Sequence, residues 1–248
     1  MSIKDKFYFF KLNKKIRSIK PQEKDTPLSK WPESWKRIYF KSYPRFPKLY
    51  LDKNILNNNK SYLIDTILKR SSYKIKHDHI HPLTKDILST IFLSSAIINN
   101  SKDIKYYSRR AYPSGGARYP LELYIIIFNT ETLKKGLYHY NVKLHALEYM
   151  WKVNTQEIYS VFKQDFSIKC SGVIIMTSII NRSAVKYEER AYTFSHIEAG
   201  HIGQNIYLLS ESIGLKSRSI GLFDNRKLLK ILGIHNEEEL IVYPLVIA

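Results

Sequence analysis

Two short and almost wholly apolar runs constrain the fold more than any other feature of this sequence. They are LELYIIIF, residues 121–128, and GVIIMTSII, residues 172–180, and both are rich in β-branched and aromatic residues. Runs of this length and composition are typical of buried strands. Both are well short of the roughly 18 apolar residues that a membrane-spanning helix needs. We therefore expect a soluble protein built around buried strands, with no membrane segment.

A hairpin and a helix are predicted around these two strands. Residues 136–150 alternate between apolar and polar side chains in two arms, with Asn141 in the connection, as in a β-hairpin. A helical pattern begins after Thr84, whose side chain can cap the N-terminus, and the polar residues 99–101 are expected to end it.

The C-terminal third adds two helices and a last strand. Apolar residues spaced three and four apart predict a helix over residues 195–213, and Gly214 stands where a left-handed C-terminal cap belongs. Asp224 can cap a short helix that ends at Gly233, and the run IVYPLVIA, residues 241–248, reads as a strand. Strands and helices mix without the regular alternation of a doubly wound sheet, so the predicted fold class is α+β.

The N-terminal residues have a different composition from the rest. Residues 1–55 contain five of the nine prolines, together with many lysines and aromatic residues, which resists long helices. We predict that residues 1–55 form an extended arm that packs on a body formed by residues 56–248.

Charge and cysteine content limit the classes of function. Forty lysines and arginines against 22 acidic residues give a formal charge of +18, which suits nucleic acid, a membrane surface, an acidic peptide or only solubility. The excess is spread along the chain, which favours a solvated surface. The single Cys170 excludes an intramolecular disulfide and a cysteine-based metal site. With no signal-peptide core near the N-terminus, these features predict a cytoplasmic protein.

Several common motifs are missing. No Gly-x-Gly-x-x-Gly, Gly-x-Ser-x-Gly or Walker-type loop is present. In HDHIH, the side chains of His77, His79 and His81 would point to one side of an extended segment and could hold a metal. Because no cysteine lies nearby, we expect a solvated loop before Pro82 and predict no metal site.

A basic segment and a glycine pair are the candidate binding elements. In LKRSSYK, the side chains of Arg70, Ser72 and Lys74 project from one side of an extended segment and suit a phosphate dianion, although solvated loops often have the same composition. In RRAYPSGGARYP, paired glycines let backbone approach a flat ligand or simply make a tight turn into the strand. Local chemistry alone does not separate these alternatives.

The segment RRAYPSGGARYPLELY resembles the signature of the SagB-type dehydrogenases, a flavin-dependent branch of the nitroreductase superfamily that makes azole rings in ribosomally made peptides. KYEERAY, EAGHIGQN and GLKSRSIGLFD follow in the family's order, and WKRIYFKSYPRFPKLYL is similar to the family's entry segment. The resemblance covers nearly the whole chain. It implies an intertwined, FMN-binding homodimer of nitroreductase fold, with a central, mainly antiparallel sheet flanked by helices and flavins at the subunit interface.

The resemblance also implies roles for individual residues. Three match the motif at the flavin phosphate: Arg70, Ser72 and Lys74. Four match the loop that lines the flavin from the other subunit: Pro113, Ser114, Gly115 and Gly116. Three match the segment along the isoalloxazine ring, with Gln204 as a further candidate: Ser219, Ile220 and Gly221. Two match the pair regarded as catalytic: Lys186 and Tyr187.

The expected activity is the oxidation of azoline rings to azoles in a precursor peptide. A base, Lys186, would take the ring α-proton while hydride leaves for FMN, and a lysine works as a base only if its pKa falls well below about 10.4. The family implies a cyclodehydratase partner that supplies the substrate. Two alternatives stay open: a flavin reductase acting on quinones, nitro compounds or another amino-acid-derived substrate, and a basic nucleic-acid-binding protein.

Three positions depart from the family pattern. Thr193 stands where an arginine is common, Arg118 replaces a common leucine in the glycine loop, and Lys74 replaces an arginine. The first puts one flavin or substrate contact in doubt.

Overall fold

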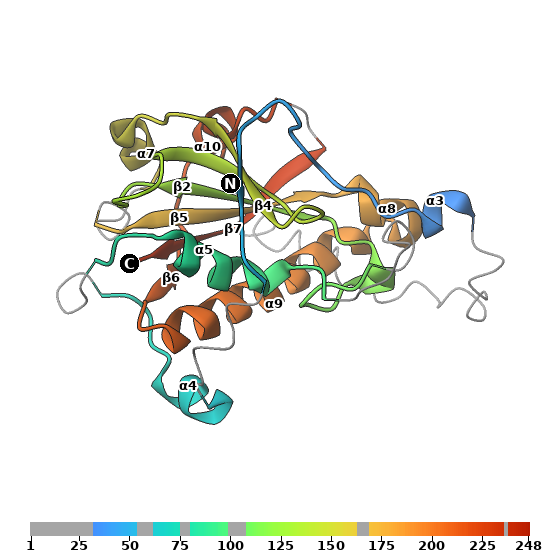
Figure 1. Cartoon of the computed structure of the whole chain (residues 1–248). Helices are drawn as coiled ribbons and strands as arrows, with labels where there is room; N and C mark the ends of the chain where they lie inside the picture. Colours follow the sequence, from blue (N-terminus) through green and yellow to red (C-terminus); the bar gives the residue numbers. More distant parts are fainter. Residues whose placement is uncertain (1–31, 54–61, 75–79, 99–107, 163–168, 236–237) are drawn as a thin grey trace, which may run out of the picture.

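The computed structural model describes residues 32–53, 62–74, 80–98, 108–162, 169–235 and 238–248. Within these ranges, seven strands form a single sheet in the order β1-β4-β3-β2-β5-β7-β6, and every neighbouring pair is antiparallel (Figure 1). The strands are β1 Lys48–Tyr50, β2 Leu121–Ile127, β3 Gly136–Asn141, β4 Ala146–Trp151, β5 Gly172–Ile179, β6 Ser217–Ser219 and β7 Glu239–Ile247. The α-helices are α3 Glu33–Lys36, α4 Leu63–Lys69, α5 Lys85–Phe92, α7 Thr155–Val161, α8 Asn181–Tyr187, α9 Arg190–Ser212 and α10 Asn225–Leu232.

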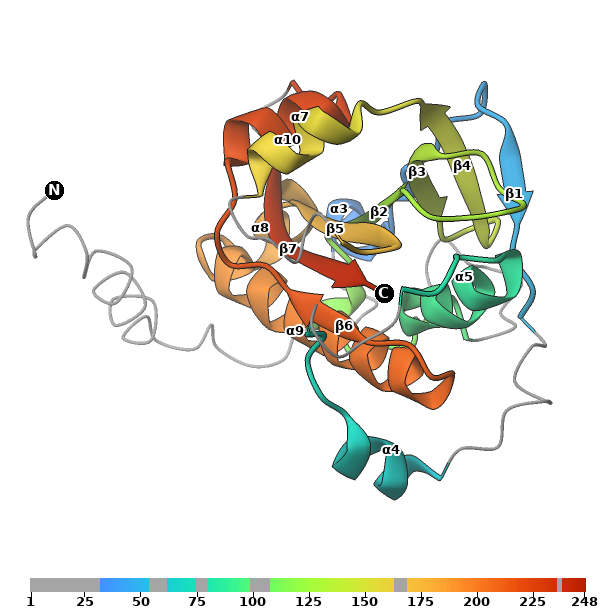
Figure 2. The same cartoon turned by 90° about the vertical axis from the view of Figure 1, so that its left-hand side faces the viewer.

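Both faces of the sheet are covered by helices. Helices α5 and α9 lie against one face, and α7 and α10 lie against the other (Figure 2). The central strands β2 and β5 are therefore buried on both sides, which is why their sequences are nearly continuous apolar runs. Alternate residues of β2 serve the two layers, since Leu123 and Ile125 face α5 and α9, whereas Tyr124 and Ile126 face α7 and α10.

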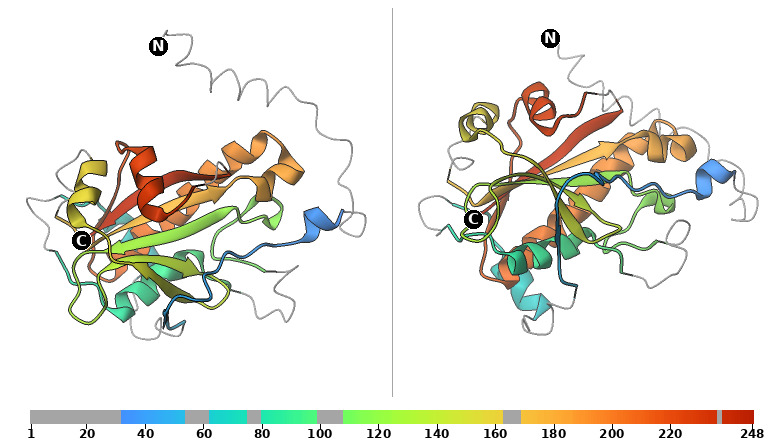
Figure 3. Two further views of the ribbon diagram at one scale, coloured as in Figure 1. Left: turned by 90° about the horizontal axis from the view of Figure 1, so that it is seen from above. Right: turned by 45° about the horizontal axis from the view of Figure 1, so that its top comes forward.

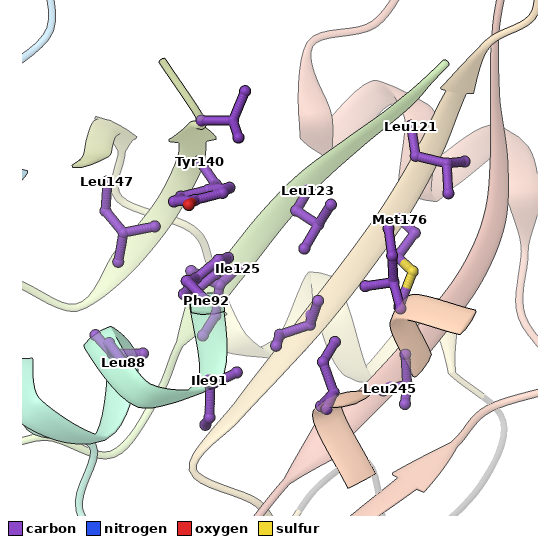
Figure 4. Close-up of a cluster of buried hydrophobic side chains, with 14 of the residues drawn as sticks. Leu88, Ile91, Phe92, Leu121, Leu123, Ile125, Tyr140, Leu147, Met176 and Leu245 are labelled. Carbon is purple, nitrogen blue, oxygen red and sulfur yellow. The ribbon is translucent and has the colours of Figure 1, made fainter. Parts of the chain in front are cut away.

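The layer beneath the sheet is a closely packed apolar cluster. Phe92 of α5 stacks near Tyr140 of β3, with ring centroids 4.7 Å apart, and Leu123 and Ile125 come from the strand beside it (Figure 4). Helix α9 contributes Ile202 and other residues to the same cluster. This packing fixes the long helix against the sheet and so positions everything attached to its two ends.

Three predicted capping residues are confirmed, although the helix predicted over residues 195–213 begins earlier, at Arg190. The side chain of Thr84 accepts a hydrogen bond from the Ile87 amide at the start of α5, and Asp224 caps α10 through the Lys227 amide. Gly214 follows α9 with a φ of 79°, which confirms the predicted left-handed residue.

The first predicted helix is too long. Helix α5 ends at Phe92, a 3₁₀ turn follows over Leu93–Ser95, and the next residues are extended. The reason is tertiary: Ile97 pairs with Arg110 in an antiparallel bridge, and the Ala111 amide donates to the Ala96 carbonyl. Partners from a distant segment of the chain thus replace the helical hydrogen bonds.

The N-terminal region reaches the sheet edge. Residues 48–50 form strand β1 beside β4, and Leu51 is buried. The remainder of the predicted arm up to residue 31, the loop 56–61, the helix stop 99–101 and the residues His77 and His79 lie outside the described residues.

Candidate functional site

The glycine loop is held by one buried carboxylate. Glu198 of α9 accepts hydrogen bonds through Oε1 from the Ser114 hydroxyl, at 2.9 Å, and from the Gly115 amide, at 3.2 Å. The Tyr119 amide in turn donates to Ser114 Oγ. These hydrogen bonds hold the loop in a defined conformation against α9.

Gly116 brings this loop against the predicted catalytic pair. Its backbone is left-handed, with a φ of 57°, a conformation that disfavours side chains with a Cβ. A Cβ at this position would lie 2.4 Å from Tyr187 Oη and 3.2 Å from Lys186 Nζ. Lys186 and Tyr187, at the end of α8, thus converge on a backbone position where a side chain would clash with them.

Glu198 is a functional candidate that sequence reasoning missed. Its side chain is buried, and its Oε2 atom has no hydrogen-bond partner among the described residues. Burial raises the pKa of this carboxyl to about 7, although the hydrogen bonds from Ser114 and Gly115 act in the opposite direction. The only signal in the sequence is a glutamate on the inward face of a long helix, within EAGHIGQN.

Tyr187 has an environment that keeps its phenol protonated. Burial raises the pKa of Tyr187, and the nearby Glu198 adds to the effect while Arg118 opposes it. Its ring packs edge-on against Phe194, with centroids 5.1 Å apart. Tyr187 is therefore placed to donate a hydrogen bond, with its ring position set by α9.

Arg118, one of the departures from the family pattern, ties three segments together. Its buried guanidinium donates from Nε to the Arg182 carbonyl and from Nη2 to the Arg37 carbonyl, each at 2.9 Å. Arg182 belongs to α8, and Arg37 follows α3. A leucine could not make these bonds, so Arg118 fixes the glycine loop relative to α8 in this chain.

The predicted phosphate residues lie at the opposite end of α9. Ser72 forms a parallel bridge with Ser217 of β6, and the adjacent Arg218 donates from Nη1 to the Tyr73 carbonyl at 3.4 Å. The guanidinium of Arg70 lies 5.5 Å from the centre of the Tyr207 ring. Basic residues from two segments are therefore gathered here, and Arg218 is one that the sequence analysis did not single out. We call this set the phosphate-end cluster: Arg70, Ser72, Lys74 and Arg218.

The end of β6 and the two residues after it lie beside the phosphate-end cluster, because Tyr207 contacts both. The Ser219 amide donates to Tyr207 Oη at 2.7 Å, while Ile220 is buried and donates its amide to the Pro244 carbonyl. Gly221 is exposed, has open space where a Cβ would stand, and its amide has no hydrogen-bond partner in the described part of the chain. Gln204 is exposed on α9.

The two sets of candidate residues do not meet within one chain. Glu198 and Tyr207 are nine residues apart on α9, which corresponds to about 14 Å along a helix. Figure 1 shows α4 and α8 at opposite ends of α9. One end carries the phosphate-end cluster and residues 219–221, and the other carries the glycine loop with Lys186 and Tyr187.

The described ranges contain no candidate metal site and no candidate membrane-spanning helix. Across the ranges that the structure covers, no three histidine, cysteine, aspartate or glutamate side chains are grouped so as to hold a metal ion. Among the helices of those same ranges, none combines the length and apolar character needed to cross a bilayer.

Comparison with known proteins adds three curated relatives and a family. The nitroreductase family model matches residues 67–247. MJ1384 of Methanocaldococcus jannaschii, named as a nitroreductase, is 29% identical over 184 residues, which are 73% of this chain and 89% of that protein. The microcin B17-processing protein McbC of Escherichia coli is 32% identical over 146 residues, 56% of this chain and 53% of McbC. The trifolitoxin-processing protein TfxB of Rhizobium leguminosarum is 35% identical over 114 residues, 43% of this chain and 31% of TfxB.

Solved structures share the fold. A nitroreductase-type structure from Ralstonia eutropha has a TM-score of 0.65 at 20% identity and covers 81% of this chain and 88% of its own. A chain of the Escherichia coli microcin synthetase McbBCD complex with truncated pro-MccB17 bound has a TM-score of 0.62 at 22% identity, with 92% and 84% covered. The antiparallel sheet and its covering helices are thus a shared architecture.

Proposed function

Because this chain belongs to the nitroreductase family, we propose that it is an FMN-dependent dehydrogenase that oxidises azoline rings to azoles in a ribosomally made peptide. The observation that carries the proposal is the convergence of Lys186 Nζ and Tyr187 Oη on the backbone of Gly116. An amine and a phenol beside a glycine that has no side chain are suited to removing a proton from a substrate ring held against a flat cofactor. The similarity to McbC and TfxB, two peptide-processing proteins, supports a peptide substrate.

The residues present fit a flavin nucleotide, the group that proteins of this family typically bind. The phosphate-end cluster offers cations and an exposed hydroxyl for a phosphate dianion. The Gly221 amide has no hydrogen-bond partner among the described residues and lies beside open space, so it could donate to the edge of the flavin ring. Gln204, exposed on the same helix as Tyr207, is a further candidate contact.

Side chains of this protein would accept the proton that the substrate ring loses and would position the ring. FMN, when bound, supplies the two-electron oxidation. Lys186 would accept the ring α-proton, and Tyr187, kept as a phenol by burial, would donate a hydrogen bond that holds the substrate. Glu198 would keep the glycine loop in place through its two hydrogen bonds.

A homodimer would complete this site. Helix α4 and the preceding Tyr62 expose a cluster of large apolar side chains, which in α4 are Leu63, Ile64, Ile67 and Leu68, and α9 exposes Ile197. Exposed apolar surface of this kind is typical of protein interfaces. In a two-fold dimer, the glycine loop of one copy would face the phosphate-end cluster of the other. A cyclodehydratase partner would supply the azoline peptide to this dimer.

Replacing Lys186 tests the chemistry. We expect Lys186→Ala to lower the rate of azoline oxidation at least a hundredfold, the usual contribution of a general base, while FMN binding and flavin turnover by a reduced nicotinamide stay near wild type. The matched control is Lys143→Ala, at an exposed position on the β3–β4 turn. Mass spectrometry of an azoline peptide, which loses two hydrogens, gives the readout.

A second candidate is a flavin reductase acting on a nitro compound, a quinone or another amino-acid-derived substrate. The observation that favours it is the similarity to MJ1384 over most of both chains. The same experiment separates the two functions. If wild-type protein turns over reduced nicotinamide and a nitroarene but leaves every azoline peptide unchanged, the reductase is the correct assignment.

A further inference from the structure

A groove lies between α7 and α10, away from the candidate site. Its volume is about 380 Å³, and its walls are Trp151, Lys152, Val153, Glu157, Ser160, Lys227, Lys230 and Ile231. Helices α7 and α10 cover the sheet face opposite α9 (Figure 2) and lie towards the other end of the molecule from α8 (Figures 1 and 3). Nothing in the proposed chemistry uses this groove.

The apolar floor of the groove is formed by Trp151, which contacts within the chain hold in place. Trp151 donates its indole N–H to the Ile231 carbonyl at 3.3 Å, and its ring lies edge-on to Phe46 with centroids 6.3 Å apart. Gly233 packs closely against the same indole ring, because a Cβ at this residue would lie only 2.7 Å from it. The indole is therefore held in place before any ligand arrives, which lowers the entropic cost of binding against it.

The rim of the groove carries three lysines without an ion-pair partner among the described residues. Lys152, Lys227 and Lys230 are exposed, and none of them makes an ion pair with the residues that the structure describes. By contrast, Lys216 is paired with Glu211 at 2.6 Å. Among the described residues that line the groove, Glu157 is the one acid against three lysines, which leaves a net positive charge beside an apolar floor. A ligand with carboxylates next to a bulky apolar side chain complements both features.

The size of the groove selects the kind of partner. A volume of about 380 Å³ is in the range of small-molecule pockets and holds a few side chains, whereas a folded partner buries about 800 Å² of each surface. The chain's own N-terminal residues do not suit it, since residues 1–31 contain nine basic residues and three acidic ones. The occupant that fits both the size and the charge of the groove is a short, acidic stretch of another polypeptide, which would place a few side chains in it.

We infer that this groove binds an acidic segment of the polypeptide substrate, with a bulky apolar side chain against Trp151 and carboxylates beside Lys227 and Lys230. The inference rests on the proposed function, because only an enzyme that acts on a polypeptide has such a segment to hold. It adds a second contact, remote from the reacting ring, that raises the affinity for the substrate without taking part in the chemistry.

Fluorescence anisotropy with labelled peptides tests the groove directly. The probes are three fluorescein-labelled dodecapeptides: one of Glu and Asp with two Phe, one with Ala in place of Phe, and one with Lys in place of the acids. At low salt we expect the first to bind at least tenfold more tightly than the other two. The variant Lys227→Glu/Lys230→Glu should weaken its binding at least tenfold.

The matched control changes the same total charge elsewhere. Lys85→Glu/Lys135→Glu alters two exposed lysines outside the groove, and we expect it to change the affinity less than threefold. Equal losses in the two double variants, or equal affinities of the Phe and Ala peptides, would show a diffuse charge effect and overturn the inference. With Trp31 and Trp35 replaced by Phe, Trp151 is the remaining tryptophan, and its emission should change when unlabelled acidic peptide binds.

Kinetics separate this inference from the proposed function. For an azoline peptide with an acidic, Phe-containing extension, Lys227→Glu/Lys230→Glu should raise KM and leave kcat unchanged. For the same peptide without the extension, neither parameter should change. If neither peptide is oxidised, the proposed function is wrong, whereas the anisotropy comparison still supports or overturns binding in the groove.

Discussion

At the scale of single residues, Gly116 shows how a missing side chain can make a site. The positive φ and the nearby Tyr187 Oη and Lys186 Nζ mean that even a methyl group would have to displace the catalytic candidates. Sequence reasoning could mark the glycine pair as unusual. It could not say which side chains occupy the space that the glycine leaves.

A double-mutant cycle measures this steric contact. We expect Gly116→Ala to destabilise the fold by about 1–3 kcal/mol, from the left-handed backbone together with the clash. In a Tyr187→Phe background the cost should be smaller by at least about 0.5 kcal/mol, because the closest atom has been removed. Urea unfolding of the four proteins gives the coupling energy, and strictly additive losses would contradict the contact.

Glu198 makes stability depend on pH near neutrality. Its pKa is raised to about 7 in the folded protein by burial, so the folded state binds the proton more tightly than the unfolded state. The stability associated with Glu198 is therefore greatest below pH 4.5 and falls as the pH rises from about 4.5 to about 7.

Glu198→Gln should abolish this dependence, because the amide oxygen can still accept from Ser114 and Gly115 but does not titrate. Relative to the variant, wild type should lose up to roughly 3 kcal/mol of unfolding free energy between pH 4.5 and pH 8. Denaturant unfolding at several pH values, taken as the difference between the two proteins, removes the effect of the other groups. A difference that stays constant with pH would show that Glu198 titrates normally.

At the scale of elements, strands β2, β3 and β4 are joined by a buried charge network. His139 of β3 lies 3.0 Å from Glu122 of β2 and 3.0 Å from Glu148 of β4. Burial disfavours the imidazolium, but the hydrogen bonds to both carboxylates outweigh it and raise the pKa of His139. Arg182 of α8 adds an ion pair to Glu122 at 2.6 Å, so the network also links the sheet to the helix that carries Lys186.

Removing the imidazole should be costly. We expect His139→Leu to lower the unfolding free energy by about 3 kcal/mol or more, because two carboxylates stay buried with fewer partners. The exposed His235→Leu is the control, and its effect should stay within about 0.5 kcal/mol. Guanidinium unfolding at pH 7 makes the comparison, and similar losses for the two variants would mean that the network contributes little.

At the scale of the whole molecule, the positions of the candidate site residues predict that each site is formed by two copies of the protein. One chain holds the phosphate-end cluster and the glycine loop at opposite ends of α9, so a dimer would build each site from two copies. Subunit complementation distinguishes this arrangement from a site within one chain.

Two inactive variants, Arg70→Ala/Lys74→Ala and Lys186→Ala, should restore activity when they are co-expressed. In the mixed dimer one site has both halves intact, so random pairing should recover about a quarter of wild-type activity. Each variant expressed alone is the control. If mixing restores nothing although mixed dimers are isolated by differential tagging, each site lies within one chain.

The sequence by itself determined the local parts of this protein. The buried strands β2 and β5, the hairpin, and the caps at Thr84, Asp224 and Gly214 were predictable, because each depends on residues that are neighbours in the chain. The candidate site residues came from recognisable motifs, since a motif preserves local residue order. Their division between the two ends of α9 did not follow from that order.

Only the tertiary structure decided what depends on contacts between distant segments. The early end of α5 results from pairing with residues 109–111, the role of Arg118 from carbonyls 64 and 81 residues away, and the importance of Glu198 from the loop folded over it. The groove beside Trp151 likewise needs α7 and α10 to meet. Burial and hydrogen bonding across long separations are properties of packing, and local propensity carries no information about them.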